Sequence, residues 1–319
     1  MSAVSRIEAP VIGKAAVRTF SARDMVVVAF LPLQFLISWC LPERLWPACA
    51  KLLNPLTSFL YVKGGDRTQD LIAAVLGQRL PPRTGRQIVR ELAAEEFILV
   101  LQILRDYRPG RWRPTIEVTG TEHLRTALGH GKGAILWFSY TFARNVIGKM
   151  AIQQAGYSVS HLARPRHGLS PTKFGIRFLN RIQTAIENRY IKERIVIHDG
   201  KFHKAMRSLI VRLRANEIIS IAVHRDAANP TSLPFLQGRI VLATGACWLS
   251  YKTGAALLPV TAYRDRKGTF KVEIDAPIDS RQFDSEEDAI SCAQRDYIAR
   301  LEPFVVEYPS QWRGWYLLS

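Results

Sequence analysis

A histidine and an aspartate, His224 and Asp226, follow the apolar run Ile218 to Val223, which has the composition of a buried strand. Residues two apart at a strand end project to the same side. A carboxylate beside one ring nitrogen orients an imidazole and stabilises its protonated form, as general-base catalysis requires. The pair could therefore accept a proton from a substrate hydroxyl, although a charged surface turn would contain the same residues.

Basic residues follow a second expected strand, Ser158 to Leu162. Arg164 and Arg166 come directly after it. Because ligands of open α/β sheets bind at the carboxyl ends of strands, these two are placed to hold a phosphate or a carboxylate. Three more cations recur at helical spacing and suggest an extended anion site or a solvated helix face: Lys173, Arg177 and Arg181.

The other histidines give weaker evidence of a functional role. His161 and His167 flank the Arg164 segment without an acidic partner nearby in sequence, so we interpret them as structural or, at most, anion-binding.

The common catalytic and metal-binding motifs are missing from the sequence. No metalloprotease, phosphate-loop or serine-hydrolase signature is present. The glycines between 129 and 133 lead into a strand and so predict a tight turn rather than a phosphate loop. The four cysteines form no C-x-x-C pair. We expect no metal, no cofactor and a reducing compartment.

The elements that must position these residues alternate between short β-rich runs and amphipathic stretches. This pattern predicts an α/β domain with a largely parallel sheet flanked by helices. The expected strands are Thr115–Thr119, Ala134–Phe138, Ser158–Leu162, Arg194–Ile197, Ile218–Val223, Ala256–Tyr263 and Phe270–Ile274. The expected helices cover 86–107, 144–155, 171–187, 201–214, 241–252 and 286–307.

The N-terminal part is different in character, and we expect a helical region over 1–110 followed by the α/β domain over 111–319. Met25 to Leu41 is the most apolar stretch and carries no charge. A spanning helix needs about 20 apolar residues, and Pro32 and Gln34 lie near the middle of this one. Three interpretations stay open: a membrane-seated or re-entrant helix, a buried core helix, and a span or signal segment. Residues 54–85 are interpreted as a Pro- and Gly-rich connector.

Charge points to an anionic partner. The 319 residues carry 44 Lys and Arg against 27 Asp and Glu, a formal charge of +17. Nucleic acid, anionic lipid and an acidic carrier protein all satisfy this electrostatic requirement. Because no nucleic-acid-binding motif is present and such a partner would not explain the apolar N-terminal segment, we expect no nucleic acid.

Several sequence blocks resemble, in the same order, those of the lipid A late acyltransferases, the lauroyl and myristoyl transferases of the lysophospholipid acyltransferase superfamily. The resemblance covers nearly the whole chain. The blocks are Gly131–Leu136, Leu162–Pro165, Pro234–Arg239, Ala243–Gly245, Thr253–Val260 and the C-terminal Tyr308–Trp315.

The resemblance implies a glycerolipid-acyltransferase-like fold and transfer of an acyl group from a thioester to a hydroxyl or amine of a membrane lipid. The thioester would be on acyl carrier protein or coenzyme A. It further implies that the apolar N-terminal segment seats the protein on the anionic cytoplasmic face of the inner membrane. Within the matched blocks, Arg239 joins Arg164, Arg166 and Lys173 as a substrate-binding candidate.

The chain departs from the family at the catalytic motif. Members carry a histidine, four residues and an aspartate or glutamate after the strand corresponding to Ala134–Phe138. Here Ser139 precedes Tyr140 in the histidine slot, and Asn145 occupies the carboxylate slot. A tyrosine with a pKa of about 10 is ionised to roughly one part in a thousand at neutral pH, and an amide supplies no charge.

Two functions from different classes therefore remain. In the first, an acyltransferase uses a relocated base, His224 with Asp226, and a neutral Ser139 or Tyr140 hydroxyl as donor to the developing oxyanion. In the second, a catalytically silent relative binds lipid, acyl chain or acyl carrier protein as a partner or scaffold.

Overall fold

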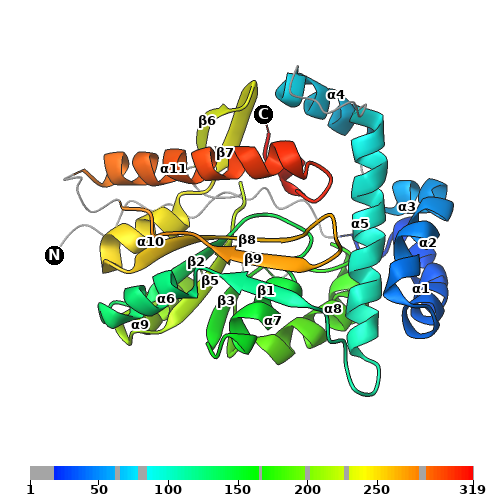
Figure 1. Cartoon of the computed structure of the whole chain (residues 1–319), viewed down its shortest axis with the longest axis horizontal. Helices are drawn as coiled ribbons and strands as arrows, with labels where there is room; N and C mark the ends of the chain where they lie inside the picture. The colour runs from blue at the N-terminus through cyan, green and yellow to red at the C-terminus, as the bar shows by residue number, and fades with distance from the viewer. Residues whose placement is uncertain are drawn as a thin grey trace.

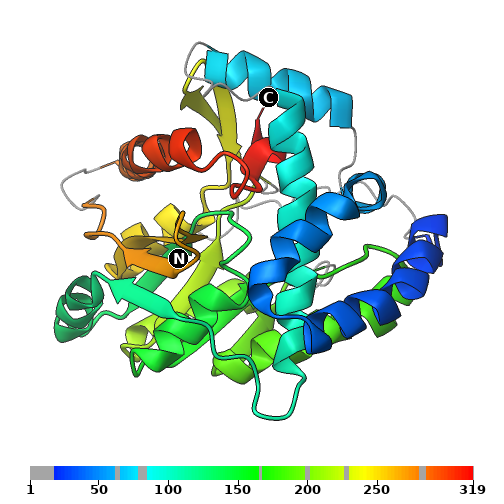
Figure 2. The same ribbon diagram turned by 45° about the vertical axis from the view of Figure 1, so that its right-hand side comes forward.

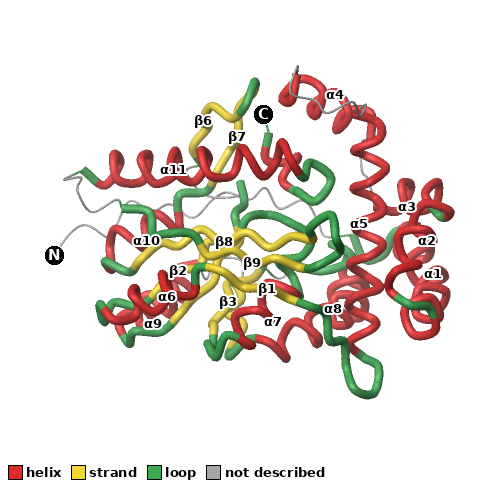
Figure 3. Tube along the Cα trace, in the orientation of Figure 1, coloured by secondary structure: helices red, strands yellow, loops and turns green. Residues whose placement is uncertain are grey.

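The computed structural model describes residues 18–61, 65–77, 85–164, 167–197, 202–225, 230–279 and 285–318. Its centre is a seven-stranded sheet in the order β1-β9-β8-β2-β5-β3-β4 (Figure 1; strands in yellow in Figure 3). The strands are β1 (Ile116–Thr119), β2 (Ala134–Phe138), β3 (Val159–Ala163), β4 (Glu193–Val196), β5 (Ile218–Ala222), β8 (Ala256–Arg264) and β9 (Phe270–Ile274). This confirms the α/β class with a largely parallel sheet.

Strand directions explain the composition of the central strands. The five strands from β8 to β4 pair in parallel, whereas β9 runs antiparallel to β8 and pairs in parallel with β1. All five residues of β2 are buried. A parallel strand covered on both faces reads as a continuous apolar run, which is why β2 and β5 are recognisable locally.

Helices cover both faces of the sheet. Trp137 of β2 packs its ring 4.3 Å from that of Tyr297, on α11 (Glu286–Glu307). Phe138 faces the other way, against α7 (Ile147–Gln154), where a Cβ built on Gly148 would lie 2.6 Å from the Phe138 ring. Any larger residue at Gly148 would push α7 off the sheet. The other helices of this domain are α6 (Thr121–Gly129), α8 (Asn180–Glu187), α9 (Phe202–Arg214) and α10 (Gly245–Thr253).

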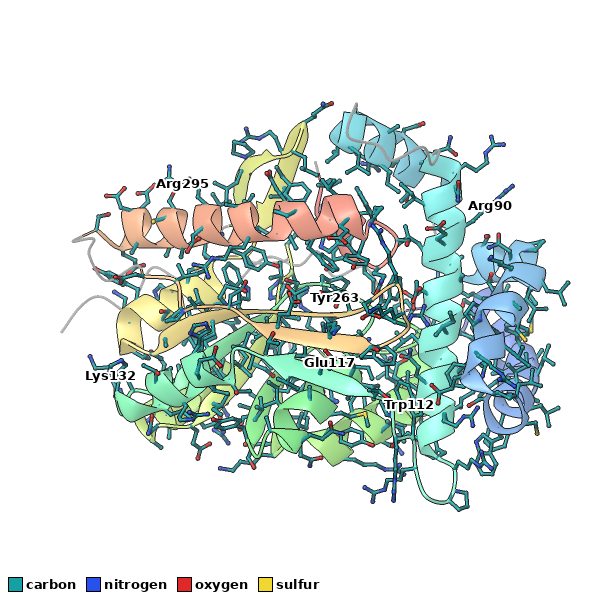
Figure 4. All side chains as sticks on the ribbon, in the orientation of Figure 1. Arg90, Trp112, Glu117, Lys132, Tyr263 and Arg295 are labelled. Carbon is teal, nitrogen blue, oxygen red and sulfur yellow. The ribbon has the colours of Figure 1, made fainter. Side chains whose placement is uncertain are left out.

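The N-terminal helices form a second layer beside the sheet, gathered around the long α5 (Gly85–Asp106) (Figures 1 and 2). They are α1 (Ala22–Cys40), α2 (Trp46–Leu52), α3 (Asn54–Tyr61) and α4 (Gly65–Leu76). Phe97 and Leu101 of α5, with Phe30 of α1, belong to an apolar cluster separate from the main core. At the foot of α5, Trp112 donates to Glu43 at 2.7 Å and packs edge-on against Phe270 of β9 (Figure 4).

The end of β8 and the segment after α11 both lie beside α5. Arg264 Nη2 at the end of β8 lies 2.6 Å from Glu95 Oε1, and Arg313 pairs with Glu96. Both carboxylates are on α5. These ion pairs hold the helical region against the carboxyl ends of the central strands.

α1 has two unlike faces. One turns toward α5 and buries residues at helical spacing, among them Val27, Phe30 and Ile37. The opposite face leaves Met25 and Leu36 more than half exposed. Among the described residues α1 is the one helix long and apolar enough to cross a membrane by length and composition, and 33% of its apolar window is buried in the protein. α1 is therefore attached along one side to α5 and leaves an apolar face exposed on the other.

A buried carboxylate fastens the start of α1 to the segment after β3. Asp24 accepts hydrogen bonds from Ser170 Oγ at 2.6 Å, Thr172 Oγ1 at 2.9 Å and the backbone of Ser21 at 2.8 Å. Burial alone would raise the pKa of Asp24, but these hydrogen bonds outweigh it and hold the pKa below its usual value. The interaction joins the helical region to a loop of the α/β domain.

Asp24→Asn should lower the free energy of unfolding by about 2 kcal/mol at pH 7, because hydrogen bonds to a charged group are lost. Since the folded-state pKa is depressed, the stabilisation is present above the unfolded-state value of about 4 and is lost as pH falls through the folded-state value. Urea unfolding at pH 7 and at pH 3 checks both statements. Asp288→Asn is the matched control, an exposed aspartate three residues after the Ser285 N-cap of α11. An equal loss in both variants would contradict the prediction.

The structure corrects three predictions about elements. The expected connector over 54–85 contains α3 and α4, because Pro55, Gly65 and Gly77 lie at helix ends rather than within the helices. A hairpin of β6 (Thr231–Phe235) and β7 (Gly238–Leu242) was not predicted, and β7 takes residues assigned to a helix from 241. The helix predicted over 171–187 opens with a π-helical turn, Gly175–Leu179. The 129–133 turn is confirmed by positive φ angles of 71° at Gly131 and Gly133.

Candidate functional site

Three of the predicted site residues follow neighbouring strands at one edge of the sheet. Tyr140, Arg164 and His224 follow β2, β3 and β5, which are neighbours in the sheet. The pairing continues past the strands, because the Val223 N–H donates to the Phe138 carbonyl at 3.0 Å. Arg164 Nη2 lies 3.2 Å from His224 Nδ1. Of these side chains, Arg164 and His224 are in contact at the carboxyl edge, and binding at that edge stays a prediction.

Tyr140 is enclosed by two guanidinium groups. The Arg144 guanidinium carbon lies 4.1 Å from the centre of the tyrosine ring, and that of Arg313 lies 5.6 Å away. Tyr316 packs edge-on at 5.1 Å. Burial raises the pKa of Tyr140, but the charges of Arg313 and Arg144 and a hydrogen bond with Tyr316 bring it below the ordinary tyrosine value. The residue in the histidine slot is thus more acidic than a free tyrosine.

The C-terminal block similar to the acyltransferase signature packs against the Tyr140 loop. The Arg313 N–H donates to the Tyr140 carbonyl at 2.7 Å, and Thr141 forms an isolated bridge with Trp312. The Gln311 amide exchanges two hydrogen bonds, of 2.8 and 2.6 Å, with the backbone of Arg264. The glutamine, tryptophan and arginine of the block therefore all contact the segments that follow β2 or end β8.

Ser139 and Asn145 are almost fully buried, each 1% exposed. The Ser139 hydroxyl accepts from Tyr297 at 3.1 Å and lies 3.0 Å from Thr261 Oγ1, so it belongs to the layer between the sheet and α11. Neither side-chain atom of Asn145 has a hydrogen-bond partner in the described part of the chain. A buried amide without partners is rare in folded proteins.

His224 is oriented by Arg164, whose guanidinium can only donate. His224 Nδ1 therefore accepts, and in the neutral imidazole the hydrogen is then on Nε2. This arrangement favours donation by His224 over proton abstraction. Its expected partner Asp226 lies outside the described residues, as does Arg166, so a His224–Asp226 base stays a prediction.

The other binding candidates lie elsewhere. Lys173 is exposed, and its backbone N–H donates to the Arg18 carbonyl at 3.0 Å, which places it beside the start of α1. Arg239 belongs to the β6–β7 hairpin, where it bonds the Ser232 hydroxyl at 3.0 Å and carbonyl at 2.8 Å. The turn of this hairpin contacts α4, since the Gln237 N–H donates to the Val75 carbonyl at 3.2 Å. Neither residue joins Tyr140 and His224 in the described contacts.

A buried charged cluster was missed. Glu187, at the end of α8, is 0% exposed and pairs with Lys149 Nζ at 2.6 Å, with His167 Nε2 at 2.8 Å and with Arg194 Nη2 at 2.8 Å. His167 has no acidic neighbour in sequence, and its partner Glu187 lies 20 residues further along the chain. The members come from four segments between 149 and 194, and no local pattern connects them. Burial alone would raise the pKa of Glu187, but His167, Lys149 and Arg194 hold it well below the usual range.

Sequence comparison identifies the family of the chain. Residues 25–316 match the family model for bacterial lipid A biosynthesis acyltransferases, and the chain belongs to that family. No curated protein matches the chain. Among solved structures, the 1-acyl-sn-glycerophosphate acyltransferase PlsC of Thermotoga maritima aligns over 90% of this chain and 97% of its own, at 13% identity and a TM-score of 0.39. The resemblance noted in the sequence is thus confirmed at the level of family.

Proposed function

We propose that the protein transfers a fatty acyl group from an acyl thioester to a hydroxyl or amine of a polar lipid or related amphiphile. The observation that carries this proposal is the family match over residues 25–316. The polar groups of the sheet edge support it, because Tyr140, Arg164 and His224 converge where ligands of such sheets bind. The donor carrier is acyl carrier protein or acyl-coenzyme A, both of which offer phosphates to the basic residues.

The membrane is the proposed source of the acceptor, at the cytoplasmic face of the inner membrane. The exposed face of α1 would insert among acyl chains, and cations beside its start would contact anionic headgroups. Lys173 and Arg177 are exposed here, and Arg177 lies 5.5 Å from the ring of Phe178, which is 53% exposed. Exposed basic and apolar side chains therefore lie next to each other on this segment, as interfacial binding favours.

The roles proposed at the sheet edge follow from protonation. Arg164, with Arg166, would bind an anionic group of either substrate by charge-assisted hydrogen bonds. The Nε2–H of His224 and the hydroxyl of Tyr140 would donate to the oxygen of the thioester carbonyl as negative charge develops there. The Ser139 hydroxyl, bonded to Thr261 and Tyr297, would support β2 rather than contact substrate.

The replacement of both motif residues favours a second candidate function. Tyr140 and Asn145 replace both members of the family pair, and the buried Asn145 amide can neither accept a proton nor carry charge. A relative that keeps the lipid and carrier surfaces without transferring acyl groups would show this combination. It would bind acyl carrier protein or lipid as a partner.

Lipid profiles of cells with and without the gene separate the two functions. The enzyme requires an acylated species that disappears on deletion and returns with the wild-type gene. Complementation with Tyr140→Phe/Asn145→Ala tests whether the old motif position contributes to chemistry, and a full return of the species would place the essential base elsewhere. An unchanged profile on deletion, together with retained binding of the purified protein to acyl carrier protein, would support the silent relative.

A further inference from the structure

The cluster around Glu187 contains the two chemical groups that the motif slots lack. The family pair joins an imidazole to a carboxylate, and here His167 Nε2 lies 2.8 Å from Glu187 Oε1 and 3.0 Å from Oε2. Gln183 also donates to Glu187 Oε1 at 2.7 Å. The carboxylate is completely buried and flanked by two permanent or near-permanent cations, so it remains ionised.

The histidine is held so that one ring nitrogen stays available. The His167 backbone N–H donates to the Arg164 carbonyl at 3.1 Å, which places His167 in the same turn after β3 that carries the anion-binding candidate. Because a carboxylate accepts at Nε2, the neutral ring has its hydrogen there and its lone pair on Nδ1. No hydrogen bond to Nδ1 is formed within the described residues, and the side chain is 19% exposed.

Arg144 connects this pair to the motif position. Its guanidinium packs on the ring of Tyr140, and its charge acts on both Lys149 and His167. Burial first, and then the charges of Lys149 and Arg144, lower the pKa of His167, whereas Glu187 raises it; the balance lies below the ordinary histidine value. The imidazole is therefore neutral at pH 7 and able to accept a proton. Burial lowers the pKa of Lys149 to about 8, although Glu187 opposes this.

We propose that His167 is the general base of this protein and that Glu187 is its orienting carboxylate, so that the base has moved from the loop after β2 to the loop after β3 and its carboxylate to the end of α8. The inference rests on the proposed acyl transfer. It assigns a role to two residues that the family motif does not contain, and it accounts for catalysis without a histidine at position 140.

The acceptor hydroxyl gives its proton to His167 Nδ1 while its oxygen attacks the thioester carbonyl carbon, which forms the new C–O bond. The imidazolium is stabilised by Glu187 through Nε2–H. As the tetrahedral intermediate collapses, the C–S bond breaks and the leaving thiolate takes the proton from Nδ1. Ester and free thiol are the products, and His167 returns to its neutral form.

The test uses the full-length protein, a radiolabelled lauroyl thioester of acyl carrier protein or coenzyme A, and membrane vesicles from cells lacking the gene as the source of acceptor. His167→Gln keeps a donor toward Glu187 but cannot accept a proton, and it should reduce label transfer by about 100-fold to 10,000-fold. His130→Gln, in the exposed turn before β2, is the matched control and should transfer at the wild-type rate. Melting temperatures show whether His167→Gln remains folded.

Two further measurements test the role of His167 if the His167→Gln protein is unstable. Added imidazole should restore part of the transfer by His167→Ala, which a purely structural histidine would not allow. The wild-type kcat/KM should fall on the acid side with a midpoint below about 6.5, the ordinary pKa of histidine. Transfer by His167→Gln within threefold of wild type, or loss only in His224→Gln, would overturn the proposal. No transfer by the wild type from either thioester would instead contradict the proposed function itself.

Discussion

Replacing Glu187 by glutamine should lower the free energy of unfolding by about 3–5 kcal/mol at pH 7. The glutamine keeps the shape of the side chain but removes the charge that compensates Lys149 and Arg194. Their side chains are only 5% and 12% exposed, so water cannot replace the lost carboxylate. Breaking one side of a buried ion pair leaves an uncompensated charge, which is the costly case.

The stability lost in Glu187→Gln depends on pH. Because the pKa of Glu187 is held well below its unfolded-state value, its stabilisation is present at neutral pH and is lost as pH falls through the folded-state value. The difference between wild type and Glu187→Gln should therefore shrink in acid. In the variant, Lys149 loses the carboxylate that raises its pKa. The Lys149 ammonium of the folded state therefore loses its proton at a lower pH than it does in the unfolded chain. Because the unfolded chain then binds more protons, the variant should gain stability as pH rises from about 7 to 10.

Denaturant unfolding from pH 3 to 10 measures both effects. Glu217→Gln is the matched control, because Glu217 pairs with Lys192 at 2.9 Å on the surface, with side chains 31% and 50% exposed. A surface pair contributes about 0–1 kcal/mol. Lys149→Met combined with Glu187→Gln should recover part of the stability, since it removes one of the stranded charges. Equal losses in Glu187→Gln and Glu217→Gln would show that the buried cluster does not have the stabilising role assigned to it.

Placing glutamate at both Val28 and Leu36 should weaken binding to vesicles of phosphatidylethanolamine and phosphatidylglycerol by about 100-fold or more. Both side chains lie on the exposed face of α1, at 44% and 59% exposure, and line one shallow apolar depression with Phe35. Burying an aliphatic side chain contributes about 1.5–3 kcal/mol, so two together account for at least two powers of ten in partitioning.

Cosedimentation with the vesicles measures this effect, and Val211→Glu is the control. Val211 is 57% exposed on α9, so it has comparable exposure outside the N-terminal helices. Wild-type binding should also weaken as salt is raised, because Lys173 and Arg177 contribute electrostatically. Binding of the Val28→Glu/Leu36→Glu protein at the wild-type level would contradict the interfacial position proposed for α1.

Much of the α/β domain could be predicted because its signals are local. The apolar runs of β2 and β5 and the amphipathic period of α5, α9 and α11 are properties of short windows. The structure confirms them within a few residues. The β6–β7 hairpin was less visible because Pro234 lies within one strand and a short Leu-Gln turn joins the two. The helix boundary at 175 was missed because a π-turn has no distinct sequence period.

The sequence by itself determined the fold class, the family and the edge at which polar groups collect. All three depend on patterns within short segments or on blocks in a given order. Only the tertiary structure decided which polar groups meet. It turned Ser139 toward α11, placed Lys173 beside α1, and brought His167, Lys149 and Arg194 onto Glu187. Such contacts depend on how separate strands and helices pack, and a carboxylate's partner can come from any segment that the fold brings within about 3 Å.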